Sequence, residues 1–283
     1  MEIRTIGVVG AGTVGHGIAQ VAVQNGFRVM LRDLDDRILQ HARSRIGKGL
    51  ERLVEAGRIA EEQKADMLKL LSVTTHLPDF KGCDVIIEAA SEDFTVKKGI
   101  FQELDKVCRP AVVLATSTSS ISITKLGATT RRPDKVIGMH FLNPVPVLQV
   151  VEVIRGMETS SETAAVTHDL AKRLGKTTVE AKDAPGFLAN RMLMPMINEA
   201  VFALMEGVGT VEAIDNVMHL GMKHPMGPLA LADLIGLDVC LAVLRSLHEG
   251  FGDSKYRPAP MLVKMVDAGH LGRKTGRGFY KHT

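Results

Sequence analysis

Cysteine is scarce in this chain of 283 residues, which contains only 3. Cys83, Cys108 and Cys240 are widely separated and form no CxxC pair. An odd, scattered set of thiols argues against a disulfide framework and against a zinc site, and it favours a reducing compartment. We therefore expect a cytoplasmic protein without a bound metal.

Long apolar runs and an excess of one charge are also absent. No stretch reaches the ~18 uncharged apolar residues of a transmembrane helix, and the opening MEIRTIGVVGAG is typical of a strand entering a turn, not of a signal peptide. The formal net charge is +3, from 35 basic and 32 acidic side chains, which is too balanced to indicate nucleic-acid binding. We expect neither a membrane nor a nucleic acid as partner.

The length is about twice the ~150 residues of a typical domain, so two domains are expected. A hydrophobic fraction of 45% and a charged fraction of 24% are ordinary for a globular protein. This composition argues against collagen-like and disordered classes.

The first half alternates strand-like and helix-like segments. The apolar run from Ile3 to Val9 ends in glycines, a helical period follows to Gly26, and a second strand spans 27–32. Further strand-like runs occupy 84–90, 111–116, 135–140, 148–154 and 177–181, and a helix is expected over 95–108. This alternation predicts an α/β fold with a Rossmann-type, doubly wound, mostly parallel sheet.

Two further features define the predicted organisation. Residues 35–71 hold two charged helical stretches where a short crossover would suffice, so we expect a projecting helical hairpin. The segment Asp183 to Gly186 punctuates the chain, and the remainder has helical periodicity. We predict domains at 1–184 and 185–283, the second with helices over 186–206, 210–220, 228–249 and 259–268.

The motif GAGTVG follows the first strand and opens a helix. Gly10 permits a tight turn, Gly12 lets the backbone approach a pyrophosphate, and Gly15 brings helix and strand together. The predicted cofactor contacts here are Gly10, Gly12, Thr13, Val14 and Gly15. Asp33, at the end of the second strand, suits a ribose 2′-hydroxyl and favours NAD over NADP, although neighbouring Arg32 leaves NADP open. The alternative is a purely structural glycine turn.

His140 ends a predicted strand and Glu152 lies on the next one. Ligands bind outside the carboxyl ends of the strands in open α/β sheets, where His140 is expected. A carboxylate bonded to one ring nitrogen would fix the tautomer and stabilise the imidazolium, making an acid/base pair. Spacing alone leaves open whether the two side chains meet, and a structural histidine beside a solvated glutamate is the alternative.

Other polar residues have both a functional and an ordinary interpretation. Ser119 follows the strand 111–116, so its hydroxyl could face the same sheet edge as His140. The ordinary interpretation is a polar turn or a helix cap. Asn190 falls early in the first helix of the second domain, where it contacts substrate or only caps the helix. Lys48 and Arg52 are i, i+4 neighbours on the hairpin, where they bind a polyphosphate or form a solvated charged face.

Several motifs, in the order and spacing of the family, resemble the 3-hydroxyacyl-CoA dehydrogenases along essentially the whole chain. Within that family the resemblance is strongest to the short bacterial 3-hydroxybutyryl-CoA dehydrogenases. These motifs are GVVGAGTVGHGIAQ, DVIIEAASED, TSTSSISI, GMHFLNPVPVLQVVEV, APGFLANRMLMPMINEA, KHPMGPLALADLIGLD and LGRKTGRGFY. The resemblance implies reversible hydride transfer between NAD(H) and carbon 3 of an acyl-CoA, in fatty acid or butyrate metabolism. It also implies a homodimer formed through the helical domain.

The resemblance also implies roles for individual residues. The catalytic group is His140 and Glu152, with Ser119 and Asn190 near the reacting oxygen. The implied cofactor contacts are Asp33, Glu92, Lys97, Asn143 and Lys274, and the implied CoA contacts are Lys48 and Arg52. Where the family usually has an asparagine, this chain has Ser117, and we expect a local change in loop contacts without loss of activity.

Two competing interpretations remain. Lysine-dependent 3-hydroxyacid dehydrogenases share the first domain, but this chain has no lysine between Lys182 and Lys223 for their catalytic position. A non-catalytic NADH-binding protein on the same scaffold is the other alternative.

Overall fold

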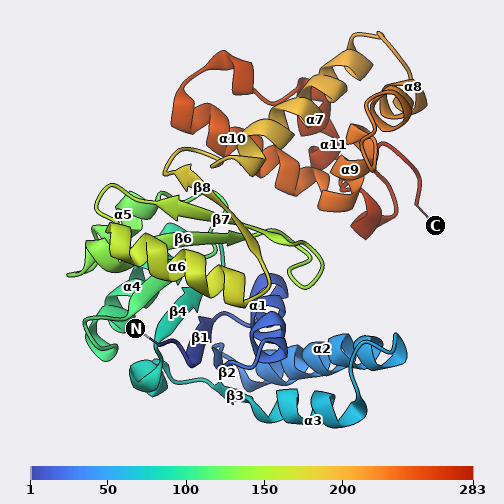
Figure 1. Cartoon of the computed structure of the whole chain (residues 1–283). Coiled ribbons are helices and arrows are strands. Elements are labelled where there is room, and N and C mark those ends of the chain that lie inside the picture. The colour runs from blue at the N-terminus through green and yellow to red at the C-terminus, as the bar shows by residue number, and fades with distance from the viewer. Residues whose placement is uncertain (1, 283) are drawn as a thin grey trace. The chain divides into compact units, whose positions relative to one another are not determined.

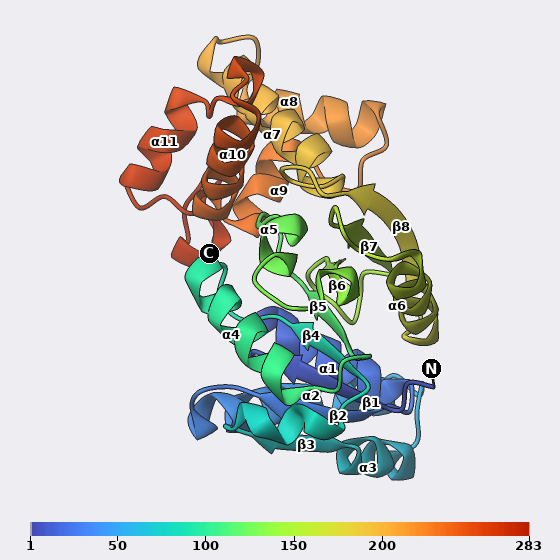
Figure 2. The same ribbon diagram turned by 90° about the vertical axis from the view of Figure 1, so that its left-hand side faces the viewer.

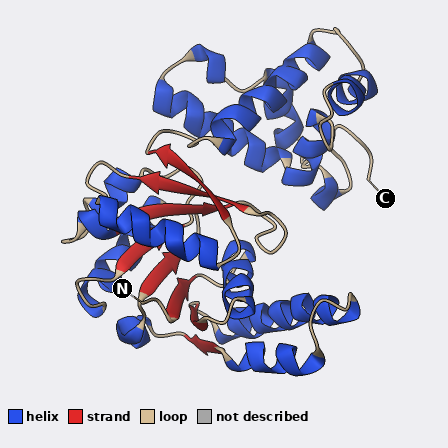
Figure 3. Cartoon of the chain, in the orientation of Figure 1, coloured by secondary structure: helices blue, strands red, loops and turns tan. Residues whose placement is uncertain are grey.

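The computed structural model describes residues 2–282, which fall into two compact units divided between Ala184 and Pro185. The first unit combines a sheet with helices, and the second is helical (Figures 1 and 3). None of the helices in the described part of the chain is long and apolar enough to span a membrane.

The first unit is built on an 8-stranded sheet with the order β3-β2-β1-β4-β5-β6-β7-β8. The strands are β1 (Thr5–Val9), β2 (Arg28–Arg32), β3 (Leu71–Thr74), β4 (Val85–Glu88), β5 (Val113–Thr116), β6 (Val136–Phe141), β7 (Val150–Arg155) and β8 (Thr177–Lys182). Every neighbouring pair is parallel except β6 and β7. Strands β4, β5 and β6 are buried along their whole length, as expected for a sheet covered on both faces. The predicted Rossmann-type sheet is confirmed.

Six α-helices and two short 3-10 helices, Leu77–Gly82 and Pro133–Lys135, accompany this sheet among the described residues. The α-helices are α1 (Thr13–Gln24), α2 (Asp36–Glu55), α3 (Glu61–Lys69), α4 (Phe94–Val107), α5 (Ile123–Gly127) and α6 (Ser161–Arg173). α2 and α3 form the expected hairpin beside β2 and β3, in both views (Figures 1 and 2). α2 buries Leu39, Ala42, Ile46 and Leu50, which recur every three or four residues along one face. The opposite face of α2 carries its charged residues.

The edge strand β3 was not predicted from the sequence. It has only 4 residues and follows α3 after the single residue Leu70. Because the helical pattern runs into it without a glycine or proline, no local signal marks where the helix ends. Pairing with β2, a non-local interaction, selects the strand.

The second unit contains α7 (Ala189–Met205), α8 (Val211–Asn216), α9 (Pro228–Ile235), α10 (Leu237–Phe251) and α11 (Pro260–Asp267). The prediction of one helix over 228–249 was wrong. Gly236 has φ 105° and separates α9 from α10. Glycine adopts such a conformation at low cost, so the chain turns there without strain. The apolar faces of α7, α9, α10 and α11 form one core.

Candidate active site

The glycine motif forms the turn between β1 and α1. Gly10 has φ 101°, a conformation that favours glycine. A Cβ on Gly15 would lie 1.7 Å from the carbonyl oxygen of Gly10, so only glycine fits where the helix meets the strand. A Cβ on Gly12 would meet no atom within 4 Å. The space in front of the α1 N-terminus is therefore open, where backbone amides and the helix dipole favour an anion.

Asp33 lies beside this turn, directly after β2. Its Oδ2 accepts a hydrogen bond from the Ala11 amide at 2.7 Å, and its Oδ1 accepts one from the Leu34 amide at 2.7 Å. Arg32, in contrast, donates from Nε to the carbonyl oxygen of Thr75 at 3.2 Å. The acidic side chain is thus fixed next to the glycine turn, while the guanidinium is anchored towards the β3 side.

A hollow of about 490 Å³ joins these features. Gly10, Gly12 and Asp33 line one side, and Ala89 and Ala90 after β4 line another. The strand order reverses between β1 and β4, and ligands of open α/β sheets bind at such a switch point. The size, the open approach to Gly12 and the carboxylate fit part of a dinucleotide. Thr13 and Val14 begin α1 at the same place.

His140 and Glu152 meet across the sheet. They are direct partners in the antiparallel register of β6 and β7, and His140 Nδ1 lies 2.6 Å from Glu152 Oε2. Both are buried, with exposed fractions of 7% and 1%. The alternative of a solvated strand glutamate is therefore wrong.

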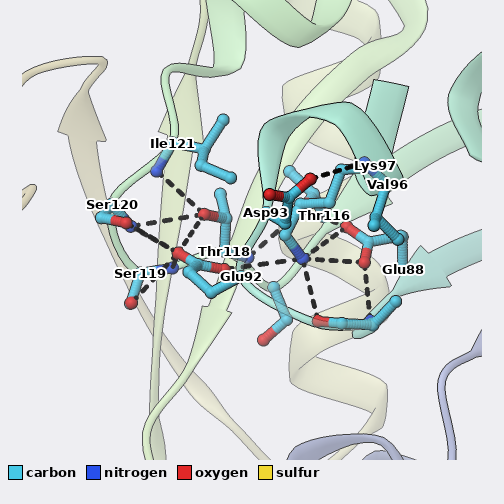
Figure 4. A network of polar contacts seen from close by, with 12 residues as sticks. Glu88, Glu92, Asp93, Val96, Lys97, Thr116, Thr118, Ser119, Ser120 and Ile121 are labelled. Atoms are coloured by element: carbon cyan, nitrogen blue, oxygen red, sulfur yellow. Dashed lines mark hydrogen bonds and ion pairs between the residues drawn. The ribbon is translucent and has the colours of Figure 1, made fainter. Parts of the chain in front are cut away.

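A third group of polar residues links α4 to the loop after β5 (Figure 4). Glu92 accepts hydrogen bonds from the side chain of Thr118 and from the amides and hydroxyls of Ser119 and Ser120. Lys97, which is 1% exposed, pairs with Glu88 at 2.8 Å and lies 3.6 Å from Glu92. Ser119 is thus in a polar turn bound by Glu92, while Ser122 caps α5.

The pKa values of the two glutamates are displaced in opposite directions. Burial raises the pKa of Glu88 above its usual value, although Lys97 opposes this effect. Burial also acts to raise the pKa of Glu92, but the hydrogen bond from Thr118 and the charge of Lys97 outweigh it, and the pKa is lowered. Glu92 therefore remains a carboxylate at neutral pH.

The other predicted site residues belong to further elements of the two units. Asn143 lies in the loop between β6 and β7, and Lys48 and Arg52 are exposed on α2. In the second unit, Asn190 is the second residue of α7. Lys274 binds Asp238, with Nζ 2.6 Å from Oδ2.

Glu88 and Thr116, which end β4 and β5, were not predicted as site residues from the sequence. Thr116 Oγ1 donates to Glu88 Oε2 at 2.7 Å, and both residues are 0% exposed. The signal in the sequence is the glutamate at the end of the otherwise apolar strand in DVIIEAA. A buried acid needs a hydrogen-bond or charged partner, so this glutamate indicates a polar contact inside the fold.

A dinucleotide hollow at the switch point, with a buried histidine–carboxylate pair on the same sheet, is the arrangement of a nicotinamide-dependent dehydrogenase. Comparison with known families agrees with this class. Residues 5–184 match the 3-hydroxyacyl-CoA dehydrogenase NAD binding domain, and residues 186–282 match the 3-hydroxyacyl-CoA dehydrogenase C-terminal domain. The chain therefore belongs to the 3-hydroxyacyl-CoA dehydrogenase family and is an NAD-dependent oxidoreductase.

Individual relatives are similar over their full length. A Bacillus subtilis protein named "Probable 3-hydroxybutyryl-CoA dehydrogenase" is 51% identical, over 100% of this chain and 98% of its own. A Bradyrhizobium diazoefficiens 3-hydroxybutyryl-CoA dehydrogenase is 50% identical, over 99% and 96%. The crystal structure of (S)-3-hydroxybutyryl-CoA dehydrogenase from Ralstonia eutropha superposes with a TM-score of 0.97 at 48% identity, covering 100% of both chains.

Proposed function

We propose that this enzyme interconverts 3-hydroxybutyryl-CoA and acetoacetyl-CoA, or similar short-chain 3-hydroxyacyl-CoA and 3-ketoacyl-CoA pairs, with NAD(H). The hydrogen bond between His140 and Glu152 carries the proposal, because it makes a buried acid/base pair in the sheet that holds the dinucleotide hollow. The names of the full-length relatives support the choice of substrate.

In this proposal His140 transfers the proton. Its Nδ1 is engaged by Glu152, so Nε2 removes the hydroxyl proton in oxidation and returns it in reduction. The Glu152 carboxylate orients the ring and stabilises its cationic form. NAD(H), when bound, supplies the hydride chemistry, while the protein supplies binding and orientation.

The remaining predicted residues bind and orient the reactants in the proposal. Ser119 and Asn190 direct hydrogen bonds to the substrate oxygen. The proposed cofactor contacts are Gly10, Gly12, Thr13, Val14, Gly15, Asp33, Glu92, Lys97, Ser119, Asn143 and Lys274. Lys48 and Arg52, exposed and four residues apart on α2, bind the CoA phosphates.

The cofactor preference follows from the fixed carboxylate. Asp33 accepts hydrogen bonds from two backbone amides at 2.7 Å. These bonds hold its side chain towards a ribose bound next to the glycine turn. A carboxylate accepts a hydrogen bond from a ribose 2′-hydroxyl and repels a 2′-phosphate. NADH is therefore expected to be used in preference to NADPH.

We also propose that the enzyme is a cytoplasmic homodimer, or an oligomer built from dimers. In the second unit Leu220, Met222 and Leu234 are 63%, 63% and 49% exposed. A second copy of the helical unit would cover exposed apolar side chains of this kind in a symmetric contact. Sedimentation of purified protein at micromolar concentration tests this, and a 30.6 kDa monomer would rule it out. The three buried free thiols fit a reducing compartment.

The reaction is tested with acetoacetyl-CoA as substrate. Purified protein is mixed with NADH or NADPH, nicotinamide absorbance is followed, and free acetoacetate is the control. We expect rapid oxidation of NADH that requires the CoA ester. Faster oxidation of NADPH would make the enzyme NADP-preferring. No oxidation by protein that demonstrably binds NADH would favour a different acyl substrate or a non-catalytic NADH-binding protein.

A further inference from the structure

Three ionisable side chains form a line from the buried end of β4 to the loop that carries Ser119 (Figure 4). Glu88 is bonded to Lys97, and Lys97 lies 3.6 Å from Glu92, which binds the loop. All of them belong to the first unit. The resemblance and the proposed function give roles to Lys97, Glu92 and Ser119 but none to Glu88.

Both carboxyl oxygens of Glu88 accept hydrogen bonds. Its Oε1 accepts from the Ala90 amide at 2.6 Å and from Lys97 Nζ at 2.8 Å. Its Oε2 accepts from Thr116 Oγ1 at 2.7 Å and from Lys97 Nζ at 3.0 Å. Donors from the loop after β4, from β5 and from α4 therefore converge on one buried carboxyl group. Such a pair adds little net stability compared with apolar packing, so positioning is the more informative role to test.

Lys97 is held between two acids. Its ammonium donates to both oxygens of Glu88 and to the Ala90 carbonyl oxygen at 3.2 Å, while Glu92 is the more distant carboxylate. The attraction between opposite charges rises steeply at short separation in a buried environment. If Glu88 lost its charge, Lys97 and Glu92 would therefore be drawn towards each other, and Glu92 would move away from the loop.

Glu92 uses its two oxygens differently. Oε2 faces Lys97, whereas Oε1 accepts from the Ser119 amide at 2.8 Å and the Ser120 amide at 3.0 Å. The Ser119 hydroxyl lies 3.2 Å from the same oxygen, a longer contact than that of its amide. Of these two contacts with Glu92, the backbone amide is thus the closer attachment of the loop.

We propose that Glu88 is a positioning residue. It holds Lys97 away from Glu92, so that Glu92 keeps its hydrogen bonds to the loop and the loop aligns Ser119 for the substrate oxygen. The part concerning the substrate rests on the proposed function. The part concerning the loop depends only on the contacts among Glu88, Lys97 and Glu92.

The loop is tested by amide hydrogen exchange of the Glu88→Gln variant. We expect the amides of Ser119 and Ser120 to exchange at least about tenfold faster than in the wild type, because their acceptor moves away. Asp105→Asn is the matched control, since Asp105 is also a buried acid bonded to cations, Arg131 and Arg132, but lies outside this network. Equal exchange in Glu88→Gln and wild type, or equal acceleration by the control, would overturn the proposal.

Coupling to Ser119 is tested by a double-mutant cycle in the acetoacetyl-CoA assay. Glu88→Gln is expected to lower kcat about tenfold or more in the wild-type background, but less than about threefold in a Ser119→Ala background. A structural loss would lower kcat by the same factor in both backgrounds, and that result would overturn the proposal. If Glu88→Gln does not fold, Glu88→Asp takes its place in both experiments, because it withdraws the carboxylate from Lys97 and keeps the Thr116 hydroxyl, which accepts a hydrogen bond from the Thr118 amide of the loop at 3.2 Å.

The two experiments separate the two proposals. A wild-type protein that does not act on acetoacetyl-CoA would contradict the proposed function. Hydrogen exchange would still decide whether Glu88 holds the loop, because it needs no turnover.

Discussion

His140 and Glu152 are 12 residues apart in sequence, yet Nδ1 of one lies 2.6 Å from Oε2 of the other. The antiparallel register of β6 and β7 places them directly opposite each other. Residues opposite each other in a sheet project from the same face, so the backbone pairing itself brings the side chains together. Because both strands are buried at this point, water competes little for the bond.

The charge of Glu152 can be removed with little change of shape. Glu152→Gln preserves the size of the side chain and a hydrogen bond to the ring, but it cannot stabilise the imidazolium. We expect kcat to fall by about 10² to 10⁴, with an NADH Kd close to that of the wild type. Steady-state kinetics and a fluorescence titration with NADH measure the two quantities. A variant that retains more than about half of the wild-type kcat would contradict the role of the carboxylate.

The glycines of the turn are expected to respond differently to substitution. In Gly12→Ala the added methyl group enters open space, and the φ of −66° suits alanine. Thermal stability should therefore be nearly unchanged, while the NADH Kd rises about tenfold or more because the methyl occupies the pyrophosphate position. In Gly15→Ala the methyl overlaps the Gly10 oxygen, so stability should fall as well.

Thermal melts and NADH titrations of both variants measure these effects. Gly82→Ala is the control, since its added methyl also meets no atom within 4 Å and lies away from the glycine turn. Unchanged NADH affinity in Gly12→Ala would show that the pyrophosphate binds elsewhere.

Asp33 is expected to determine the choice of cofactor. Asp33→Ala removes an acceptor for the ribose 2′-hydroxyl and the repulsion of a 2′-phosphate, so the ratio of kcat/KM for NADPH to that for NADH should rise about tenfold or more. Arg32 lines the same hollow and is the available cation for the phosphate. Adding Arg32→Gln should therefore reverse part of the gain. An unaltered ratio in Asp33→Ala would contradict the assignment.

Asp105 provides a prediction about stability and pH. Burial acts to raise the pKa of this carboxyl, but hydrogen bonds from Arg131 and Arg132 outweigh burial and lower it. A carboxyl with a lowered pKa stabilises the folded state above its unfolded pKa of about 3.9, and this contribution is lost as the pH falls through the folded value. Asp105→Asn should thus cost about 3 kcal/mol at pH 7.

Urea titrations at several pH values measure this difference in unfolding free energy. The unfolding free energies of the wild type and Asp105→Asn should show the whole difference at pH 7 and a smaller difference below about pH 4. A difference that is constant from pH 7 to pH 3 would show that the charge of Asp105 is not the cause.

Most of the fold was predictable because local patterns agree with the tertiary structure. The apolar strands, the period of α1 and the charged hairpin each have a sequence signal. β3 was missed because four residues after a helix carry too little periodicity, and its pairing partner β2 lies about 40 residues earlier in the chain. The break at Gly236 was missed because a lone glycine within a helical pattern is usually tolerated.

The candidate site was predictable only in part. The glycine turn and Asp33 have a defined spacing, so sequence alone places them together. His140 and Glu152 could be named but not joined, because their contact depends on strand direction and register. Glu88 and Thr116 were not predicted because each ends an apolar strand. Only the pairing of β4 with β5 brings them into hydrogen-bonding distance.

The most direct test of the account is to separate proton transfer from cofactor binding at His140. Wild type and His140→Gln are compared for oxidation of NADH by saturating acetoacetyl-CoA and, in parallel, for the Kd of NADH. We expect the turnover of His140→Gln to fall by about 10² to 10⁴, while the Kd of NADH changes less than about twofold. Turnover near that of the wild type, in a variant with normal NADH binding, would contradict the assignment of His140 as the acid/base.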